Sequence, residues 1–453
     1  MTATPTILLI SANQFDKPYP VYPIGLSYIA TYLKEKLPHY RVEIFDLFLN
    51  DFEKLESVIE LLNPKYIGIS LRNVDDANSL SKGSFIENYR KAIALIRKVS
   101  RATIIAGGAG FSIFPEKLHR LLKPDFGIYG EGEASFHQLI NCLDKGVNFK
   151  HIEGLVYKSG QQVIMNKRKH YCHDLALNFE NNLTDFYWQH SGMLSVQTKR
   201  GCPYKCIYCS YPVIEGKKIR TLNTDKILAA LEDLYYNKGI NYVFFTDSVF
   251  NIENKYNHEL ADKIIRSGMK IKWGAYFTFK NLDEALLRKL KQSGLTHVEF
   301  GTESLSDRSL KNYGKSFTVS EVIEKSDMCR TLGIDFIHFI ILAGYGETDE
   351  TINETFENSK KIGLTAFFPF VGMRIYPRTR LQQLAINDGT ISADDDLLEP
   401  RYYISKHVDL STLQTRADAT GKNWIFPDKD FSENMKKFRI KNKKGPLWEY
   451  SLS

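Results

Sequence analysis

Short apolar runs alternate with amphipathic stretches over residues 5 to about 145. The run Thr6–Ser11 is almost continuously apolar, as expected for a strand that helices cover on both faces. The stretch 24–37 then places its apolar residues at helical spacing. The same alternation predicts strands at 42–45, 66–71, 103–106 and 126–129 and helices at 55–62 and 87–99. This pattern predicts an α/β fold whose N-terminal domain has a doubly wound, Rossmann-like parallel sheet.

A strand-and-helix unit then repeats about six times between residues 194 and 385. The predicted strands lie at 194–198, 242–246, 272–276, 297–301, 336–342 and 366–374. This repetition predicts a partial (β/α)6 barrel that is open on one side. Because chemistry in such barrels takes place at the carboxyl ends of the strands, the residues just after each strand are candidates for the site.

Two less regular segments flank the barrel. Residues 146–193 form a predicted connector, with a hairpin around Ser159-Gly160 and a polar stretch at 174–185 that we interpret as a linker. Residues 386–453 mix polar and aromatic positions, and we expect them to form a small C-terminal cap over the barrel mouth. The predicted domains are therefore 1–145, 146–193, 194–385 and 386–453.

The composition suits a globular chain of two or three domains. Of the 453 residues, 43% are hydrophobic, which is enough for a sizeable core. No apolar run reaches the roughly 18 residues of a membrane span, and the N-terminal residues lack the pattern of a signal peptide. We therefore expect a cytoplasmic protein without a membrane span.

The net charge of +7 is modest, and much of it comes from residues 167–169 and 436–444. A solvated surface is the favoured interpretation of these basic clusters, and binding to an acidic lipid surface or to an anionic substrate is the alternative. No long basic stripe or added RNA-binding domain is present. Nucleic acid is therefore not expected as a partner.

Three cysteines, Cys202, Cys206 and Cys209, lie within eight residues in the pattern Cys-x3-Cys-x2-Cys. A tetrahedral zinc site normally needs four ligands, but the next cysteine is Cys329. A four-iron cluster held by three thiolates leaves one iron open to another ligand. The spacing therefore favours a [4Fe-4S] cluster over zinc or unliganded buried thiols. Cys142, Cys172 and Cys329 are interpreted as buried apolar residues.

The cysteine spacing, with Tyr208 just before the last cysteine, resembles the cluster loop of the radical S-adenosylmethionine (SAM) superfamily. The resemblance implies that the three cysteines are cluster ligands and that SAM binds the open iron with Tyr208 beside its adenine. It also implies SAM contacts from residues that follow barrel strands, namely Asp247, Glu303 and Arg374. Helix capping or a salt bridge is the alternative role for these charged residues. Residues 344–348 resemble the family's Gly-x-Pro-Gly-Glu-Thr turn but lack its proline.

The segments 23–26, 107–111, 115–116 and 130–133 look, in this order, like the cobalamin-binding domain that precedes many radical SAM cores. The Asp-x-His-x-x-Gly motif with which some cobalamin domains bind cobalt is missing. Radical SAM relatives typically lack it as well, so its absence is compatible both with cobalamin binding and with its loss. The resemblance implies cobalamin contacts from Asn13, Ser70, Leu71, Arg72, Gly107, Gly108, Gly110, Gly130, Glu131, Gly132 and Glu133.

The resemblance implies a cobalamin-dependent radical SAM enzyme that methylates an unactivated carbon of a small-molecule or lipid substrate. A reduced cluster would cleave SAM to a 5'-deoxyadenosyl radical, with flavodoxin or ferredoxin as the electron donor. One alternative is an enzyme of the same architecture that catalyses ring closure, oxidative rearrangement or coupling of lipid chains. The other is a non-catalytic metal-binding sensor or assembly factor.

Overall fold

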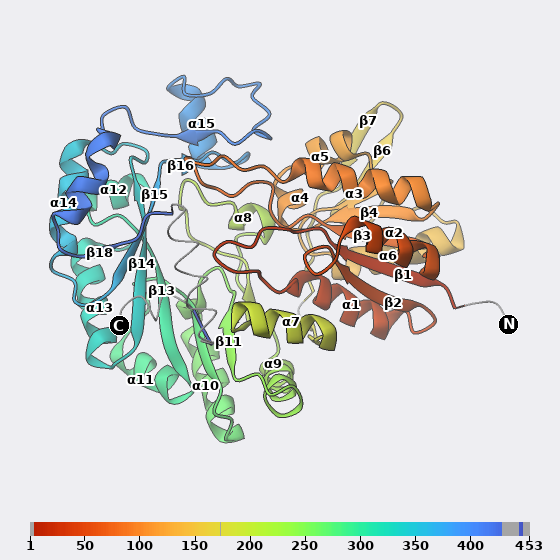
Figure 1. Ribbon diagram of the computed structural model, residues 1–453, viewed down its shortest axis with the longest axis horizontal. Helices are drawn as coiled ribbons and strands as arrows, with labels where there is room; N and C mark the ends of the chain where they lie inside the picture. Colours follow the sequence, from red (N-terminus) through yellow and green to blue (C-terminus); the bar gives the residue numbers. More distant parts are fainter. Residues whose placement is uncertain (1–3, 173, 428–443, 447–453) are drawn as a thin grey trace.

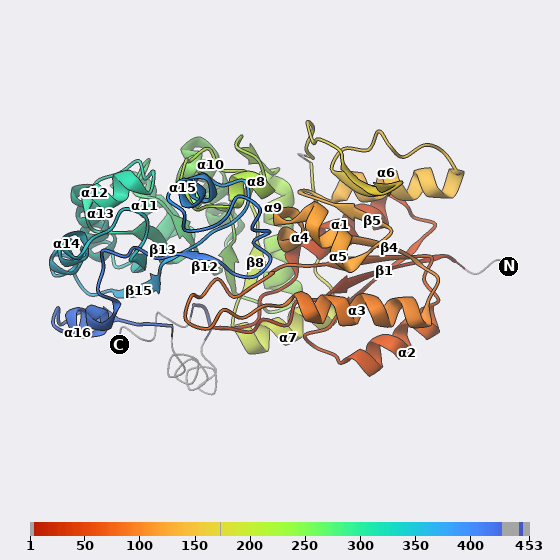
Figure 2. The same cartoon turned by 90° about the horizontal axis from the view of Figure 1, so that it is seen from above.

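Two parallel sheets lie side by side along the long axis of the molecule (Figures 1 and 2). The computed structural model describes residues 4–172, 174–427 and 444–446. The basic residues 436–443 and parts of the predicted C-terminal cap lie outside the described residues. Among the described residues, no helix is both long enough and apolar enough to cross a bilayer.

The N-terminal sheet has the strand order β2-β1-β3-β4-β5-β6-β7. Its first five strands are parallel, and β6 and β7 pair in the antiparallel sense. These strands are β1 (Thr6–Ser11), β2 (Arg41–Asp46), β3 (Tyr66–Ser70), β4 (Thr103–Gly107), β5 (Phe126–Ile128), β6 (Leu155–Ser159) and β7 (Gln162–Met165). The hairpin expected around Ser159-Gly160 therefore forms and extends this sheet.

Helices cover both faces of the N-terminal sheet, so that successive residues of β1 enter two separate cores. Ile7 and Leu9 pack with helices α1 and α6, whereas Leu8 and Ile10 pack with helices α2 to α5. The bounds are α1 (Ile24–Lys36), α2 (Phe52–Leu62), α3 (Ile86–Val99), α4 (Ala109–Ile113), α5 (Pro115–Leu122) and α6 (Glu133–Lys145). This double cover explains the continuous apolar run of β1.

The second sheet is a seven-stranded partial barrel with the order β18-β15-β14-β13-β12-β11-β8. All its pairings are parallel. The strands are β8 (Leu194–Val196), β11 (Tyr242–Phe245), β12 (Lys272–Phe277), β13 (Leu295–Glu303), β14 (Asp335–Leu342), β15 (Ala366–Val371) and β18 (Asn423–Trp424). The sequence predicts the first six, but β18 comes from the expected cap and pairs with β15.

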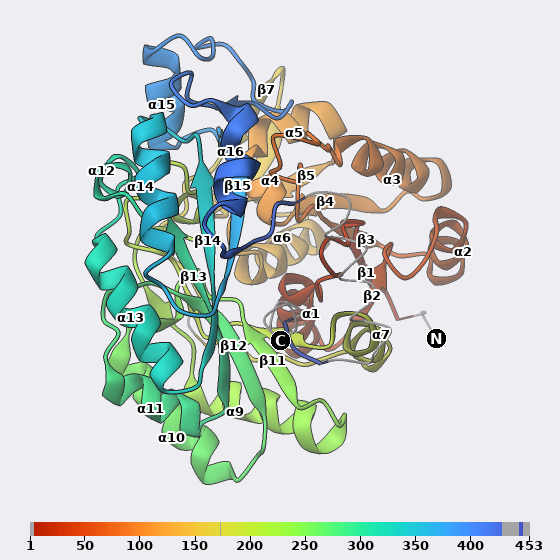
Figure 3. The ribbon, with the colours of Figure 1, turned by 60° about the vertical axis from the view of Figure 1, so that its left-hand side comes forward.

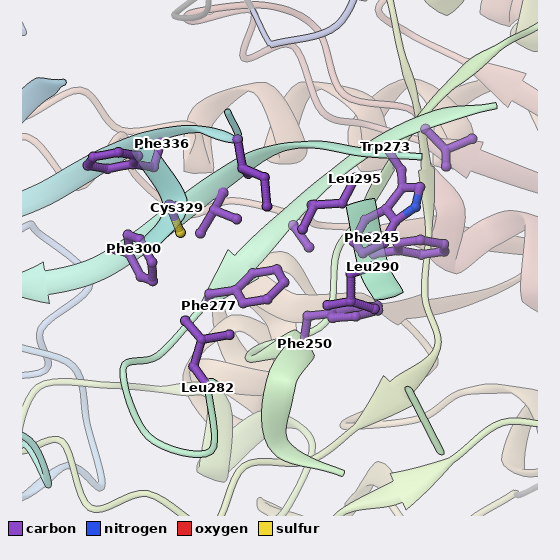
Figure 4. Close-up of a cluster of buried hydrophobic side chains, with 14 of the residues drawn as sticks. Phe245, Phe250, Trp273, Phe277, Leu282, Leu290, Leu295, Phe300, Cys329 and Phe336 are labelled. Atoms are coloured by element: carbon purple, nitrogen blue, oxygen red, sulfur yellow. The ribbon is translucent and has the colours of Figure 1, made fainter. Parts of the chain in front are cut away.

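Among the described residues, helices cover the outer face of the barrel sheet (Figure 3). They are α9 (Thr224–Glu232) with its π-helical extension η1 (Asp233–Asn237), α10 (Asn254–Ser267), α11 (Glu284–Gln292), α12 (Asp307–Asn312), α13 (Val319–Thr331), α14 (Asp349–Ser359) and α16 (Leu413–Asp418). Figure 4 shows part of the core between sheet and helices, where Trp273 and Phe277 of β12 meet Phe245 and Phe250. The 3-10 turn η2 (Phe250–Ile252) contributes Phe250.

The remaining elements connect the two sheets. They are α7 (Asn181–Ser191), β9 (Lys199–Arg200), α8 (Tyr211–Ile214), β10 (Arg220–Thr221), β16 (Met373–Arg374), α15 (Arg380–Asn387), β17 (Tyr402–Tyr403) and η3 (Leu410–Thr412). The segment expected to be a linker runs into α7, because Leu183 and Tyr187 pack into the barrel-side core. A single apolar cluster contains Ile10 and Ile69 of the N-terminal domain together with Met373 and Ile375.

Candidate active site

The three motif cysteines lie on the loop between β9 and α8. Backbone hydrogen bonds hold this loop: the Cys202 N–H donates to Gly216 O at 3.1 Å, and the Ile207 N–H donates to Tyr313 O at 3.0 Å. Gly201, with φ +88°, lies where a Cβ atom would come within 2.2 Å of Lys218 O. The loop therefore needs glycine immediately before Cys202.

The three thiols are near enough to one another to perturb each other's ionisation. Burial raises the pKa of Cys209 to about 12, with smaller contributions from Cys206 and Cys202 in the same direction. Burial also raises the pKa of Cys202. Within the described residues, no three His, Cys, Asp or Glu side chains are grouped to hold a single metal ion. The donor set of three convergent thiols fits a polynuclear cluster, whose positive charge would stabilise the thiolates.

A buried ion pair adjoins the cysteine loop. The Lys315 ammonium donates to Glu303 Oε1 at 3.2 Å and to Gly301 O at 3.0 Å. It lies 5.7 Å from the centre of the Tyr208 ring. Although burial lowers the pKa of Lys315, Glu303, Cys206 and Cys209 raise it overall. The structure thus brings Glu303 and Tyr208 together near the cysteines, and contact of these two residues with SAM stays a prediction.

Lys315 was not among the residues predicted from the sequence. It follows Gly314 in the loop after α12, and no spacing in the sequence relates it to the cysteines. Its Nζ atom is a cation next to a carboxylate, and this pairing can bind the carboxylate and amino groups of an amino acid. Lys315 is therefore a candidate SAM-binding residue beside the cysteine loop.

Asp247 is buried beside the entrance to the same loop. Its carboxylate accepts from the Thr198 N–H at 2.6 Å, from the Lys199 N–H at 3.0 Å and from the Thr198 hydroxyl. It also lies 3.1 Å from the Lys199 ammonium. These contacts favour a role in positioning the chain before Cys202, and contact of Asp247 with SAM stays a prediction.

Arg374 joins the two domains. Its Nε atom donates to Asp75 Oδ2 at 2.8 Å, and both terminal nitrogens donate to backbone carbonyls, among them Leu397 O at 2.8 Å. Nearby, Arg378 donates to Ser112 O and Ile113 O at the end of α4. This geometry favours a structural role for Arg374, whose contact with SAM likewise stays a prediction.

The residues expected to contact cobalamin follow strands β1, β3, β4 and β5, so they share one edge of the N-terminal sheet. Asn13 supplies a buried Oδ1 atom that has no hydrogen-bond partner among the described residues. Gly108, at φ +97°, allows the chain after β4 to approach Leu71 O, which a Cβ atom would meet at 2.7 Å. An unsatisfied buried acceptor at the rim and a glycine-rich edge fit a large polar cofactor such as cobalamin.

Two of these expected contacts are instead paired with arginines of the barrel unit. Glu133 Oε1 accepts from Arg200 at 2.8 Å, and Glu131 Oε1 accepts from Arg220 at 2.5 Å. The second oxygen of Glu131 lies 3.6 Å from Arg200. All four side chains are at most 7% exposed. The geometry favours a buried tie between the domains, and contact of Glu131 and Glu133 with cobalamin stays a prediction.

Comparisons with known proteins agree with this arrangement. The family model of the radical SAM superfamily matches residues 196–358, and the model of the B12 binding domain matches residues 17–140. An uncharacterized methyltransferase of Pyrococcus horikoshii is 27% identical over 376 residues, which cover 80% of this chain and 78% of that protein. Tryptophan 2-C-methyltransferase of Streptomyces laurentii is 21% identical over 443 residues, which cover 82% and 73%.

Solved structures show the same fold. The radical SAM methyltransferase TsrM from Kitasatospora setae, with tryptophan and a SAM analogue bound, superposes with a TM-score of 0.88 at 19% identity over 98% of this chain and 97% of that one. The cobalamin-dependent radical enzyme OxsB gives a TM-score of 0.73 at 18% identity, covering 92% of this chain and 66% of that one.

The chain therefore carries a B12-binding domain followed by a radical SAM domain. Its cofactors are a [4Fe-4S] cluster, SAM and cobalamin, and its relatives include methyltransferases. The predicted fold class and cofactors are thereby confirmed.

Proposed function

We propose that this enzyme methylates an unactivated carbon of a small molecule bound between the N-terminal domain and the barrel. The observation that carries the proposal is that the carboxyl edge of the N-terminal sheet faces the barrel. The loops after β1, β3 and β4 point toward the barrel (Figure 1), and the loop after β3 contacts β16 through Asp75 and Arg374. Both cofactor edges therefore face one interface. We propose that the connector between the two domains spans residues 146–193.

In this proposal Cys202, Cys206 and Cys209 ligate the cluster. Lys315 and Glu303 bind the carboxylate and the amino group of SAM, since each presents the opposite charge. Asn13 and the backbone of residues 70–72, 107–110 and 130–132 hold cobalamin. Bound together, these cofactors supply a methyl donor, a methyl carrier and a one-electron reductant. The protein holds them in line and excludes water.

The curated relatives support methylation without identifying a substrate. They include a tryptophan methyltransferase, a hopanoid methylase and two bacteriochlorophyllide methyltransferases, but also magnesium-protoporphyrin cyclases. We infer that a small electron carrier such as flavodoxin or ferredoxin reduces the cluster in the cytoplasm, as the sequence predicts.

The test begins with anaerobic reconstitution with iron, sulfide and hydroxocobalamin, followed by desalting and metal analysis. Retention of about four irons and about one cobalt per chain is expected. Extracts of the source cells are then incubated with the reduced enzyme and SAM that carries a deuterated methyl group. A product heavier by a CD3 unit supports methylation, whereas 5'-deoxyadenosine with no labelled product favours ring closure or rearrangement.

Two cysteine variants control the test. Cys206→Ser removes one proposed ligand, so iron content and SAM cleavage should fall to background. Cys142 is buried in the N-terminal core, so Cys142→Ser should retain both. Equal iron content in the two variants would contradict the proposed ligand set.

A further inference from the structure

The inner face of the barrel sheet differs from its outer face in exposure. On β12, Ala275 and Phe277 are fully buried in the outer core, whereas Tyr276 between them is half-buried. On β14, His338 and Ile340 are buried, whereas Phe339 between them is half-buried. Because strand residues alternate between faces, Tyr276 and Phe339 lie on the inner side of the sheet and are partly exposed there.

Aromatic rings from four strands lie on this inner face. The ring of Tyr276 lies 5.0 Å from Phe244 of β11 and 6.4 Å from Phe339. Phe339 lies 6.0 Å from Phe368 and 6.4 Å from Phe370, both on β15. We name these five residues the aromatic belt. Ring pairs at such separations are favourable, so the belt is a preformed surface.

The belt is interrupted opposite Phe339, where the central strand β13 carries Gly301. A Cβ atom at Gly301 would lie 3.3 Å from Glu303 Oε1 and 3.9 Å from Lys315 Nζ. The gap in the belt therefore opens directly toward the ion pair beside the cysteine loop. A molecule on the belt would be next to the proposed SAM site.

The N-terminal domain reaches this face of the sheet. Tyr19, in the loop after β1, packs against the cluster that contains Phe368 and against the cluster that contains Phe244.

We propose that the substrate is a flat aromatic compound that stacks on Tyr276 and Phe339. Planar rings gain from offset or edge contacts with aromatic side chains, a gain that a saturated ring of the same size lacks. The assignment rests on the proposed function, because it takes the carbon to be methylated to lie beside the cluster and the corrin.

The experiment compares 2-naphthol with decahydro-2-naphthol, which has the same carbon skeleton but is saturated. Isothermal titration uses the protein reconstituted with cluster, cobalamin and SAM. We expect 2-naphthol to bind about tenfold more tightly, as expected for aromatic contacts worth roughly 1.4 kcal/mol. Failure of 2-naphthol to bind, or equal affinity for the two probes, would overturn the assignment.

Variants locate the binding site. Tyr276→Leu combined with Phe339→Leu should reduce the preference for 2-naphthol to less than about threefold, while Tyr276→Phe should retain it. Tyr236→Leu is the matched control, because Tyr236 is 60% exposed on η1 outside the belt. Circular dichroism and thermal unfolding establish that each variant folds. A preference that survives the double variant, or that Tyr236→Leu abolishes equally, contradicts the proposal.

Iron and cobalt are measured on the same samples. Normal metal content without a preference for the aromatic probe rejects the aromatic substrate and leaves the methyltransferase proposal standing. Absence of cobalt rejects the methyltransferase proposal. Titration of 2-naphthol into the protein as purified then tests separately whether the belt binds an aromatic compound.

Discussion

The two parallel sheets of this enzyme bury their faces in different ways. Strand β1 sends alternate residues into two apolar cores that helices of the same domain cover, and one of these cores continues into the barrel unit through Met373 and Ile375. Strand β12 sends Trp273, Ala275 and Phe277 into one helix-covered core, but its inner face carries Tyr276 in the aromatic belt. A parallel sheet thus keeps partly exposed side chains on the face where its second layer of helices is replaced by another domain.

The strongest test of this difference is removal of a large side chain from the outer face of β12. Trp273 is 1% exposed and packs against Phe245 and Phe250. Trp273→Ala should therefore lower the free energy of unfolding by about 3–5 kcal/mol, through lost burial and the cavity left behind. Urea denaturation measures the change, and a loss below about 1 kcal/mol would show that this face is loosely packed.

A second prediction concerns the carboxyl edge of the barrel sheet, where burial raises the pKa of Glu347 to about 7. The folded state therefore binds this proton more tightly than the unfolded state, whose carboxyl has a pKa near 4.5. The stability contributed by the protonated form is complete below pH 4.5 and is lost as the pH rises to about 7. The loss is of the order of 3 kcal/mol.

Glu347→Gln should flatten this pH dependence, because the amide cannot ionise and its oxygen can still accept from the Gly344 N–H, which is 3.0 Å from Glu347 Oε2. Unfolding in urea at several pH values between 4.5 and 8 measures the slope. An unchanged slope in the variant would assign the pH dependence to other groups.

The buried ion pair between the two domains should contribute less to the free energy of unfolding than the apolar core does. Glu133→Gln removes the carboxylate that pairs with buried Arg200, and we expect a loss of about 2 kcal/mol. The matched control is Glu43→Gln, since the Arg41–Glu43 pair has a similar distance of 2.7 Å but is exposed. That change should cost less than about 0.5 kcal/mol. Equal effects in urea denaturation would contradict a buried tie.

The smallest change in stability is expected for a substitution within the aromatic belt. Tyr276→Phe keeps the ring and removes only a hydroxyl at a half-buried position, so stability should change by less than about 1 kcal/mol. A thermal shift assay detects the difference from Trp273→Ala on the same strand. A large loss would mean that the hydroxyl, rather than the ring, supports this face.

Much of the fold could be predicted from the sequence, because the strands and helices of both sheets have strong periodicity. The linker expected at 174–185 was partly wrong, since Leu183 and Tyr187 of α7 find apolar partners that a local pattern cannot reveal. The cap expected to lie outside the barrel also contributes β18, a strand of two residues that is too short to show a pattern.

The site was only partly predictable, for a similar reason. The cysteines and Tyr208 are identified by local spacing, whereas charged residues are defined by distant partners. Arg374 pairs with a residue 299 positions earlier, and Glu133 pairs with one 67 positions later. Lys315 is recognised only when folding brings its ammonium to Glu303.

The buried ion pairs between the two domains also bear on how the chain folds during its synthesis. Asp75, Glu131 and Glu133 leave the ribosome well before Arg374, Arg200 and Arg220, their partners in the folded protein. Buried charges without partners are costly, so these carboxylates must stay hydrated while the first sheet folds. The nascent N-terminal domain therefore presents an acidic rim to water, and this rim closes completely only after Arg374 has been synthesised.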